Sequence, residues 1–129
     1  MATVARVRWI LVFIGGGLGS LLRFELGGFV QSRIGSAFPW GTLSVNALGC
    51  LAIGVLATWF DERAEGGHDA RLLLIAGVLG GFTTFSTFGL ETYRLLEDAR
   101  YAAAFGNAAG SFAVCLTAVA TGVAIGRAG

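Results

Sequence analysis

The stretch Gly80-Gly81-Phe82-Thr83-Thr84-Phe85-Ser86-Thr87-Phe88-Gly89 lies in the middle of the third long apolar segment of the chain. Paired glycines and four hydroxyl residues within ten positions make a poor continuous helix. Ser and Thr side chains offer alternative partners to backbone groups, which permits a helix to break. At membrane depth a broken helix is tolerated only inside protein or beside a cavity, where its freed carbonyl groups can coordinate a cation. The stretch therefore predicts a membrane span that is interrupted at its centre.

The charge distribution predicts four membrane-spanning helices. The chain has 129 residues, of which 55% are hydrophobic and 13% charged, whereas a soluble domain carries about 25% charged residues. A spanning helix needs about 20 mostly apolar residues. The charged residues separate four such segments, and the first is long enough only if it includes Arg23 and Glu25. We expect an all-α integral membrane protein in which residues 1–129 form one domain, with spans at about 7–28, 40–60, 72–97 and 101–126.

The composition excludes several classes of function. A net charge of +1 leaves no basic surface for nucleic acid, and the absence of lysine excludes a lysine-containing phosphate loop. His68 is the only histidine, so the chain offers few ligands for a zinc site and a single candidate base for Ser-His-Asp catalysis. Cys50 and Cys115 lie in separate spans without metal-ligand spacing, and we interpret them as packing residues. We therefore expect no enzymatic activity.

The arginines give a weak signal for orientation in the membrane. With four spans, the N-terminus, the second connection and the C-terminus share one side, which holds five arginines against three on the other. The two sets are Arg6, Arg8, Arg63, Arg71 and Arg127, and Arg33, Arg94 and Arg100. So small a bias either suffices for one orientation or allows copies to insert both ways and pair antiparallel. A signal peptide is the alternative for the first span, but no A-x-A-like site follows it, so we expect the span to be retained.

Small residues spaced four apart predict close helix packing. In lipid, helices associate through such strips rather than through the hydrophobic effect. The pairs are Gly15 and Gly19, Gly16 and Ser20, Gly77 and Gly81, and Gly106 and Gly110. In the fourth span Asn107 and Ser111 share a face, which indicates interhelical hydrogen bonding. Because four helices enclose little interior, a path for a solute more readily needs an oligomer.

Polar side chains within the spans are candidates for function, because placing them in lipid is costly. Arg23 either reaches the interface with its long stem or places a positive charge in an aqueous vestibule that attracts an anion. Asn46 either makes an interhelical hydrogen bond or donates to a passing anion. Phe85 and Phe88 share a helix face, where they either pack or present the positive edges of their rings to an anion. Glu91 either lines a vestibule or belongs to a solvated helix end, and we favour the helix end.

Four segments of the chain resemble one known family. The string Gly80–Phe88 (GGFTTFSTF) is similar to the GGxTTFSTF signature of the microbial fluoride channels of the Fluc (CrcB) family. The segments Gly15–Arg23 (GGGLGSLLR), Pro39–Asn46 (PWGTLSVN) and Asn107–Phe112 (NAAGSF) resemble the first, second and fourth spans of that family. The resemblance covers essentially the whole chain, and a nine-residue match with matching flanks is highly specific.

The resemblance implies a fluoride-selective channel in the inner (plasma) membrane. It implies passive fluoride efflux that relieves toxicity, rejection of chloride, and two pores in an antiparallel, dual-topology homodimer. It also implies a structural Na⁺ at the dimer centre, held by the backbone carbonyls of Gly80 and Thr83 from both subunits.

By the matched positions, the resemblance also assigns residues to the pore. Phe85 and Phe88 would be the pore phenylalanines, Asn46 the pore amide, and Arg23 the vestibule charge. The polar lining would include four further residues: Ser86, Thr87, Asn107 and Ser111.

Two other functions fit a small four-span protein. A proton-coupled multidrug exporter needs a carboxylate in the middle of the first span, whereas Glu25 lies past Arg23 near the end of that span. In a non-transporting membrane assembly subunit, every polar group would only hold helices together. Replacing Phe85 and Phe88 with Ile distinguishes this last alternative from a pore.

Overall fold

The computed structural model describes residues 2–62 and 67–129, which form long helices and, within those ranges, no strand. In chain order the helices are α1 (Ala2–Ile34), α2 (Trp40–Glu62), α3 (His68–Arg71), the π-helical η1 (Leu72–Leu79), α4 (Gly80–Phe82), α5 (Phe85–Glu97) and α6 (Tyr101–Ala128). Four stretches are long and apolar enough to cross a membrane: Arg6–Ile34, Trp40–Glu62, His68–Glu97 and Tyr101–Ala128. The expected all-α, multi-pass membrane protein is therefore confirmed, and its helices extend beyond the expected span limits.

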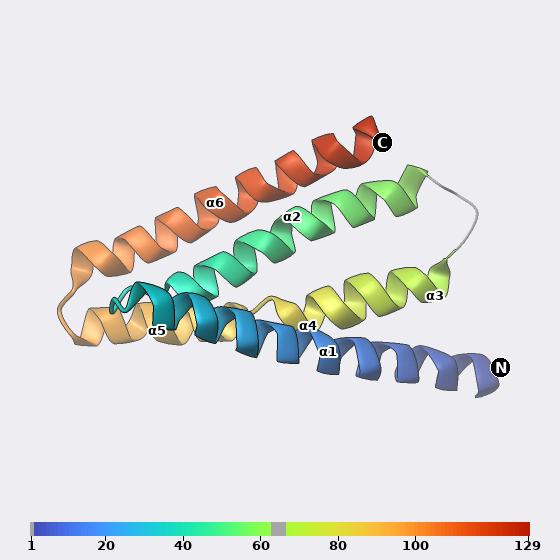
Figure 1. The fold of residues 1–129 in the computed structure, drawn as a ribbon, viewed down its shortest axis with the longest axis horizontal. Coiled ribbons are helices and arrows are strands. Elements are labelled where there is room, and N and C mark those ends of the chain that lie inside the picture. Colours follow the sequence, from blue (N-terminus) through green and yellow to red (C-terminus); the bar gives the residue numbers. More distant parts are fainter. Residues whose placement is uncertain (1, 63–66) are drawn as a thin grey trace.

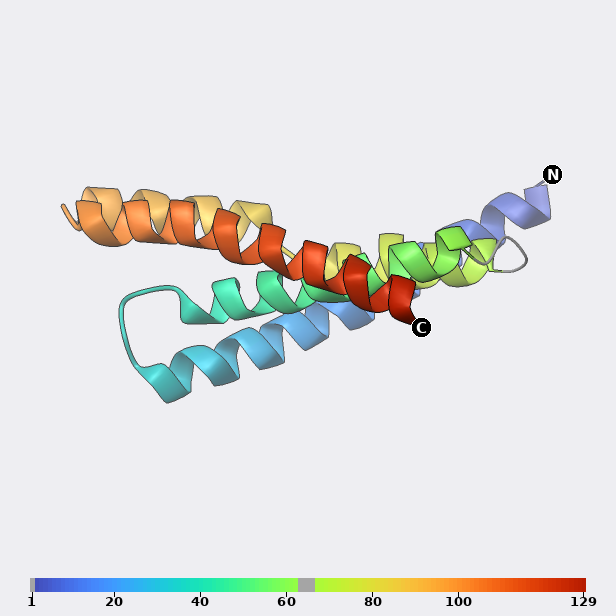
Figure 2. The same ribbon diagram turned by 90° about the horizontal axis from the view of Figure 1, so that it is seen from above.

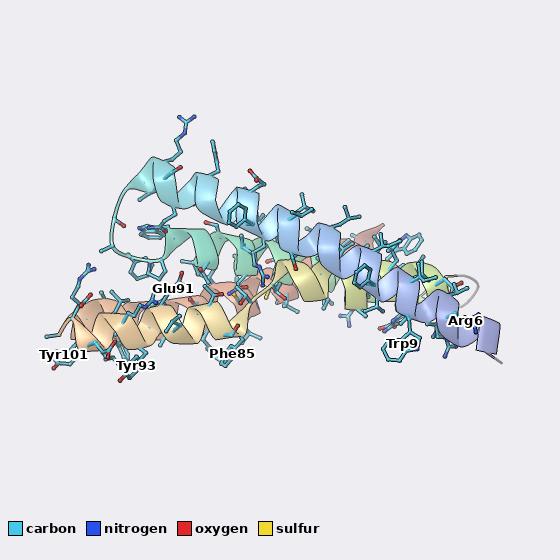
Figure 3. The ribbon with its side chains drawn as sticks, turned by 90° about the horizontal axis from the view of Figure 1, so that it is seen from below. Arg6, Trp9, Phe85, Glu91, Tyr93 and Tyr101 are labelled. Carbon is cyan, nitrogen blue, oxygen red and sulfur yellow. The ribbon has the colours of Figure 1, made fainter. Side chains whose placement is uncertain are left out.

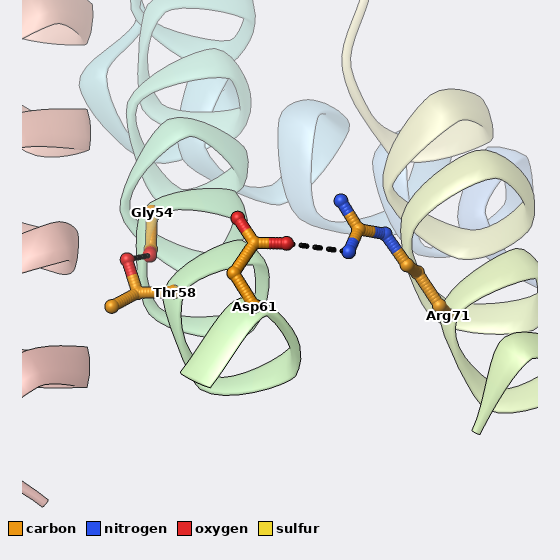
Figure 4. A network of polar contacts seen from close by, with 4 residues as sticks. All are labelled: Gly54, Thr58, Asp61 and Arg71. Carbon is orange, nitrogen blue, oxygen red and sulfur yellow. Dashed lines mark hydrogen bonds and ion pairs between the residues drawn. The ribbon is translucent and has the colours of Figure 1, made fainter. Parts of the chain in front are cut away.

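Both termini lie at one end of the bundle (Figure 1). The C-terminal end of α2 and the start of α3 lie at the same end, as four alternating spans require. There, Arg71 Nη1 lies 2.6 Å from Asp61 Oδ1 and ties α3 to α2, one turn beyond a hydrogen bond from the Thr58 hydroxyl to the Gly54 carbonyl (Figure 4). Arg63, which enters the orientation count, lies outside the described residues.

At the opposite end, Gln31 organises the connection between α1 and α2. Its Nε2 donates to the carbonyl oxygens of Ser36 (2.7 Å) and Phe38 (3.1 Å). Its Oε1 accepts the backbone N–H of Gly41 at 3.0 Å. Because the first N–H groups of a helix have no partner within it, this last bond both caps α2 and fixes its return alongside α1.

The third span changes its packing partner part-way along. Its first half, η1 and α4, packs against α1, whereas α5 packs against α6, and α2 packs along α6. Figure 2 shows the consequence from above, where α1 and α2 diverge from α5 and α6 toward one end of the molecule. In that region, residues of α1, α2 and α5 line a cavity.

Glycine contacts hold α1 against the first half of the third span. A Cβ atom at Gly15 would lie 2.6 Å from the carbonyl oxygen of Leu73, and one at Gly19 would overlap the carbonyl oxygen of Val78. Across the contact, a Cβ atom at Gly81 would overlap the backbone of α1. The packing predicted from the glycine pairs of the first and third spans is therefore confirmed.

The fourth span packs through glycines that lie outside the predicted strips. A Cβ atom at Gly122 would overlap the carbonyl oxygen of Leu51, and one at Gly54 would overlap the backbone of α6. By contrast, a Cβ atom at Gly106 or Gly110 would have no neighbour within 4 Å among the described residues. The close packing predicted for Gly106 and Gly110 is therefore not found within the described part of the chain.

Candidate functional site

The third span is interrupted at Thr83 and Thr84, within the stretch indicated by the sequence. Both residues have extended backbones, with φ and ψ of −82° and 153° for Thr83 and −147° and 123° for Thr84. Because α4 ends at Phe82 and α5 begins at Phe85, these two residues separate two helical segments of one span. The predicted break is therefore present.

The side-chain amide of Asn46 on α2 binds the non-helical backbone of Thr84 at the interruption. Its Oδ1 accepts the backbone N–H of Thr84 at 2.8 Å, and its Nδ2 donates to the carbonyl oxygen of the same residue at 2.9 Å. Thr84 is only 9% exposed, and a buried polar group left without a partner costs about 1–3 kcal/mol. The side-chain amide thus replaces helical hydrogen bonds that Thr84 lacks.

The interruption deprives two carbonyl groups of their usual helical donors. In a continuous helix the N–H of Thr84 would bond to Gly80, and the N–H of Thr87 to Thr83. Here the Thr84 N–H donates to Asn46, and the Thr87 N–H donates to the Thr84 hydroxyl at 3.3 Å. The Gly80 and Thr83 carbonyls are the two that the resemblance assigns to a cation. Hard cations prefer oxygen ligands, so these residues are chemically suited to Na⁺.

Arg23 approaches the interruption from α1. Its Nη1 donates to the carbonyl oxygen of Thr83 at 3.4 Å, near the long end of the hydrogen-bond range. The same side chain lines a cavity of about 470 Å³, whose wall also includes Ser20, Thr87 and Glu91. Arg23 therefore brings a positive charge to this first cavity and to the edge of the break.

Glu91 also lines the first cavity, so of its two interpretations the structure favours the vestibule wall over the solvated helix end. Its Oε1 accepts the Thr42 hydroxyl at 2.8 Å, and its Oε2 is buried without a hydrogen-bond partner among the described residues. Figure 3 shows Glu91 on the side of α5 that faces α1 and α2, whereas Phe85 points to the outer side. Because Glu91 lies one turn after Thr87 on α5, both side chains line the wall of this cavity.

A second cavity, of about 400 Å³, adjoins the break and is lined by Asn46, Phe85, Phe88 and Ser111, among others. The two phenyl rings have centroids 5.4 Å apart and planes tilted by 39°, which confirms that they share a face. Asn46 retains a second Nδ2 hydrogen for which the described part of the chain offers no partner. The second cavity thus combines an available amide donor with two aromatic rings.

The other predicted lining residues lie partly on the surface and partly in the interior. Ser86 and Thr87 are exposed at the start of α5, with their hydroxyl oxygens 3.5 Å and 3.0 Å from the hydroxyl that caps this helix. Asn107 is only 2% exposed, and its Nδ2 donates to the Thr92 hydroxyl at 2.8 Å while its Oδ1 accepts the Ser111 hydroxyl at 3.4 Å. Asn107 therefore lies in the contact between α5 and α6, and Ser111 lines the second cavity.

An interrupted span beside two cavities lined by hydroxyl, amide and aromatic groups defines a multi-pass membrane protein that can form a path for a solute. Residues 2–62 and 67–129 contain no group of three or more His, Cys, Asp or Glu side chains arranged to hold a metal ion. The chain belongs to the family of CrcB-like proteins (Camphor Resistance, CrcB), whose family profile matches residues 10–123.

Named relatives resemble the chain over nearly its full length. It is 44% identical over 122 residues to the "Fluoride-specific ion channel FluC" of Rhizobium johnstonii, a match that covers 95% of this chain and 98% of that protein. It is 42% identical over 118 residues to the protein of the same name from Chloroflexus aurantiacus, covering 92% and 94%. The identity to the Thermus thermophilus protein of that name is 47% over 121 residues, covering 94% of each. The family resemblance indicated by the motifs is confirmed.

Proposed function

We propose that the chain is a fluoride-selective channel of the inner (plasma) membrane, through which fluoride leaves the cell passively and fluoride toxicity is relieved. The observation that carries the proposal is the second cavity, where Asn46 presents an amide donor beside Phe85 and Phe88. Relatives at 42–47% identity that are named fluoride-specific channels support it. A channel moves an ion and catalyses no reaction, in agreement with the expectation that the chain is not an enzyme.

The lining of the second cavity suits a small anion that binds water strongly. A path for fluoride must replace that water, and the remaining Asn46 N–H can donate a hydrogen bond in its place. The Ser111 hydroxyl can do the same once it leaves Asn107 Oδ1, to which it donates here at 3.4 Å. Phenyl rings add a positive edge without a formal charge. None of the described residues that line this cavity is charged, which keeps binding weak enough for the ion to leave. Chloride is larger and gains less from the same donors.

The first cavity serves as the vestibule. Arg23 gives it a positive charge, and such a charge raises the local concentration of anions. Thr87 lies in the same wall, and with Ser86 it offers hydroxyl donors along α5 toward the phenyl rings. Asn107 acts one step further away, because its Oδ1 accepts the Ser111 hydroxyl and thereby holds that side chain at the wall of the second cavity.

The functional unit that we propose is an antiparallel, dual-topology homodimer with two pores. Phe85 is 83% exposed on the surface of the single chain, so one wall of the second cavity is incomplete. A second copy on this face would complete it. The nearly balanced arginines, five against three, are compatible with insertion in both orientations.

The proposed dimer holds a structural Na⁺ through the carbonyl oxygens of Gly80 and Thr83 from both copies. Supporting this assignment, the N–H groups that would bond to these oxygens in a helix are taken by Asn46 and by the Thr84 hydroxyl. The ion would supply a positive charge that joins the two chains at the break.

Fluoride and chloride efflux from liposomes tests the proposed activity. With purified protein and no proton gradient, we expect fast fluoride efflux and chloride efflux no faster than from protein-free liposomes. Equal efflux of the two anions would contradict a fluoride channel. Transport of organic cations driven only by a proton gradient would favour the multidrug exporter, and no transport of either kind would favour the assembly subunit.

Removal of Na⁺ tests the proposed cation site separately. When Na⁺ is replaced by a large organic cation, we expect the dimer to dissociate more readily or fluoride efflux to stop. Chemical cross-linking measures the dimer, and a fluoride electrode measures efflux. If neither changes, the assignment of Na⁺ to Gly80 and Thr83 is wrong, whereas the proposed fluoride path is unaffected.

A further inference from the structure

The only two cysteines of the chain meet between α2 and α6. Each lies in a different span and shows no metal-ligand spacing in sequence, yet both line one cavity, one turn before the contact at which a Cβ atom on Gly54 would overlap the carbonyl oxygen of Val119. Both are free thiols, and both are only partly buried. Two adjacent free thiols form a pair of soft sulfur ligands, which the linear sequence did not reveal.

The close packing of α2 and α6 holds this pair in place. One turn beyond Cys50, a Cβ atom at Gly54 would lie 2.9 Å from the backbone nitrogen of Val123, and one at Gly122 would lie 3.0 Å from the Cα atom of Gly54. The two backbones are therefore in direct contact beside the thiols. Neither helix can shift outward without losing this contact. The contact therefore fixes α2 and α6 in a register that places both sulfur atoms at the wall of the same cavity.

The thiol pair opens into the second cavity. Cys50 and Cys115 line the same space of about 400 Å³ as Phe85 and Phe88. Among the described lining residues, none carries a carboxylate or an imidazole. Thiolate sulfur selects soft metal ions, whereas oxygen ligands select hard ones, so the chemistry of this wall differs from that of the carbonyl groups at the break.

We propose that Cys50 and Cys115 form a two-thiolate binding site for a soft, thiophilic cation of the Cu(I), Ag(I) or Hg(II) class. With Hg²⁺, two S–H bonds break, two S–Hg bonds form, and two protons pass to water, without oxidation or reduction. The bound metal occupies part of the second cavity and obstructs the path of the anion. Binding is independent of the proposed function, and only the obstruction rests on it.

Retention of Hg²⁺ tests the thiol pair directly. Wild-type protein in liposomes is loaded with Hg²⁺ and then washed with a monothiol competitor. The competitor is kept below about 1 mM, because the second cysteine of a pair acts at an effective concentration of roughly that size. We expect wild type to retain one Hg²⁺ per chain, and Cys50→Ser and Cys115→Ser to hold it about a hundredfold more weakly. The Cys50→Ser/Cys115→Ser double variant should retain none, although it keeps His68, and Ala variants provide a second set with the same expectation.

Several outcomes would overturn the proposal. Single variants that retain Hg²⁺ as tightly as wild type would show that the thiols act separately, and retention by the double variant would place the metal elsewhere. Fluoride efflux measured on the same liposomes should fall with Hg²⁺ in wild type and remain unchanged in the double variant. If both cysteines are needed to retain Hg²⁺ but fluoride efflux does not fall, the bound metal does not obstruct the path of the anion. Pairwise retention in a protein that moves no fluoride even without Hg²⁺ would support the metal site and refute the proposed channel.

Discussion

The third span and α6 are similar in composition, yet only the third span is interrupted. Both are long and apolar enough to cross a membrane, and both carry several hydroxyl side chains. In α6 the hydroxyls of Thr117 and Thr121 donate to carbonyl oxygens one turn earlier, at 2.7 Å and 2.9 Å, and the helix continues. In the third span Thr84 gives its backbone N–H to Asn46 instead. A hydroxyl that bonds to a carbonyl leaves the helix intact, whereas an amide that captures an N–H ends it.

Helix α1 shows that glycine is not sufficient for a break either. It contains the run Gly15–Ser20, which is richer in glycine than the interrupted stretch, and it is continuous from Ala2 to Ile34. Its glycines serve packing, because those at positions 15 and 19 meet the backbone of the third span. The break thus depends on a long-range partner on α2, and the glycines around it allow close approach.

The largest expected effect compares phenyl rings at the break with one on a continuous helix. Phe85→Ile and Phe88→Ile should each reduce fluoride efflux to the rate of protein-free liposomes, because an aliphatic side chain lacks the positive ring edge. Phe13→Ile on α1 is the matched control, since Phe13 and Phe85 are equally exposed at 83%, and it should conduct as wild type does. Normal efflux in both break variants, with intact dimers, would refute the pore assignment.

The next effect separates the packing role of glycine from any role in the break. In Gly19→Ala the added methyl group would meet the backbone of Val78, and overpacking of this kind costs about 1–3 kcal/mol. In Gly17→Ala it would meet open space among the described residues and should raise helix stability by up to about 1 kcal/mol. Thermal unfolding in detergent measures both changes. Equal unfolding temperatures for the two variants would contradict the close contact.

A smaller effect compares two threonines whose hydroxyls have different partners. Thr84→Val removes the hydroxyl that accepts the Thr87 N–H at the start of α5, and loss of such a cap costs about 0.5–2 kcal/mol. Thr121→Val removes an exposed hydroxyl from α6 and should change stability by less than about 0.5 kcal/mol. Denaturant titration of the two variants checks this, and a larger loss at Thr121 would reverse the comparison.

The smallest effect concerns the ion pair far from the break. Asp61→Asn removes the 2.6 Å ion pair with Arg71. The Asp61 side chain is 63% exposed and the Arg71 side chain 47% exposed. Exposed pairs contribute about 0–1 kcal/mol, so the unfolding temperature should change little and fluoride efflux not at all. A loss of efflux in this variant would show that the end of α2 is coupled to the path.

Much of the fold was predictable because it depends on local composition. Apolar length located the four spans, and the run from Gly80 to Phe88 located the interruption. Glycines four apart on the first and third spans also indicated their contact. These features follow from the length of one helix in lipid or from spacing within one helix, which a single sequence displays directly.

The unpredicted parts depend on contacts between distant segments. The bonds from Asn46 to Thr84 join residues on different helices, and spacing within either helix does not reveal them. The half-buried position of Glu91 follows from the hydroxyl of Thr42 on α2. The meeting of Cys50 and Cys115 depends in the same way on the register of α2 against α6.

The central claim is that Asn46 holds open the break on which the fluoride path depends, and fluoride efflux from an Asn46→Leu variant tests it most directly. Leu is close in size to Asn but can bond neither to the N–H nor to the carbonyl of Thr84. We predict that Asn46→Leu dimers of wild-type size release fluoride no faster than protein-free liposomes, while Thr121→Val dimers match wild type. Fluoride efflux at the wild-type rate from Asn46→Leu dimers, with chloride still excluded, would contradict the account.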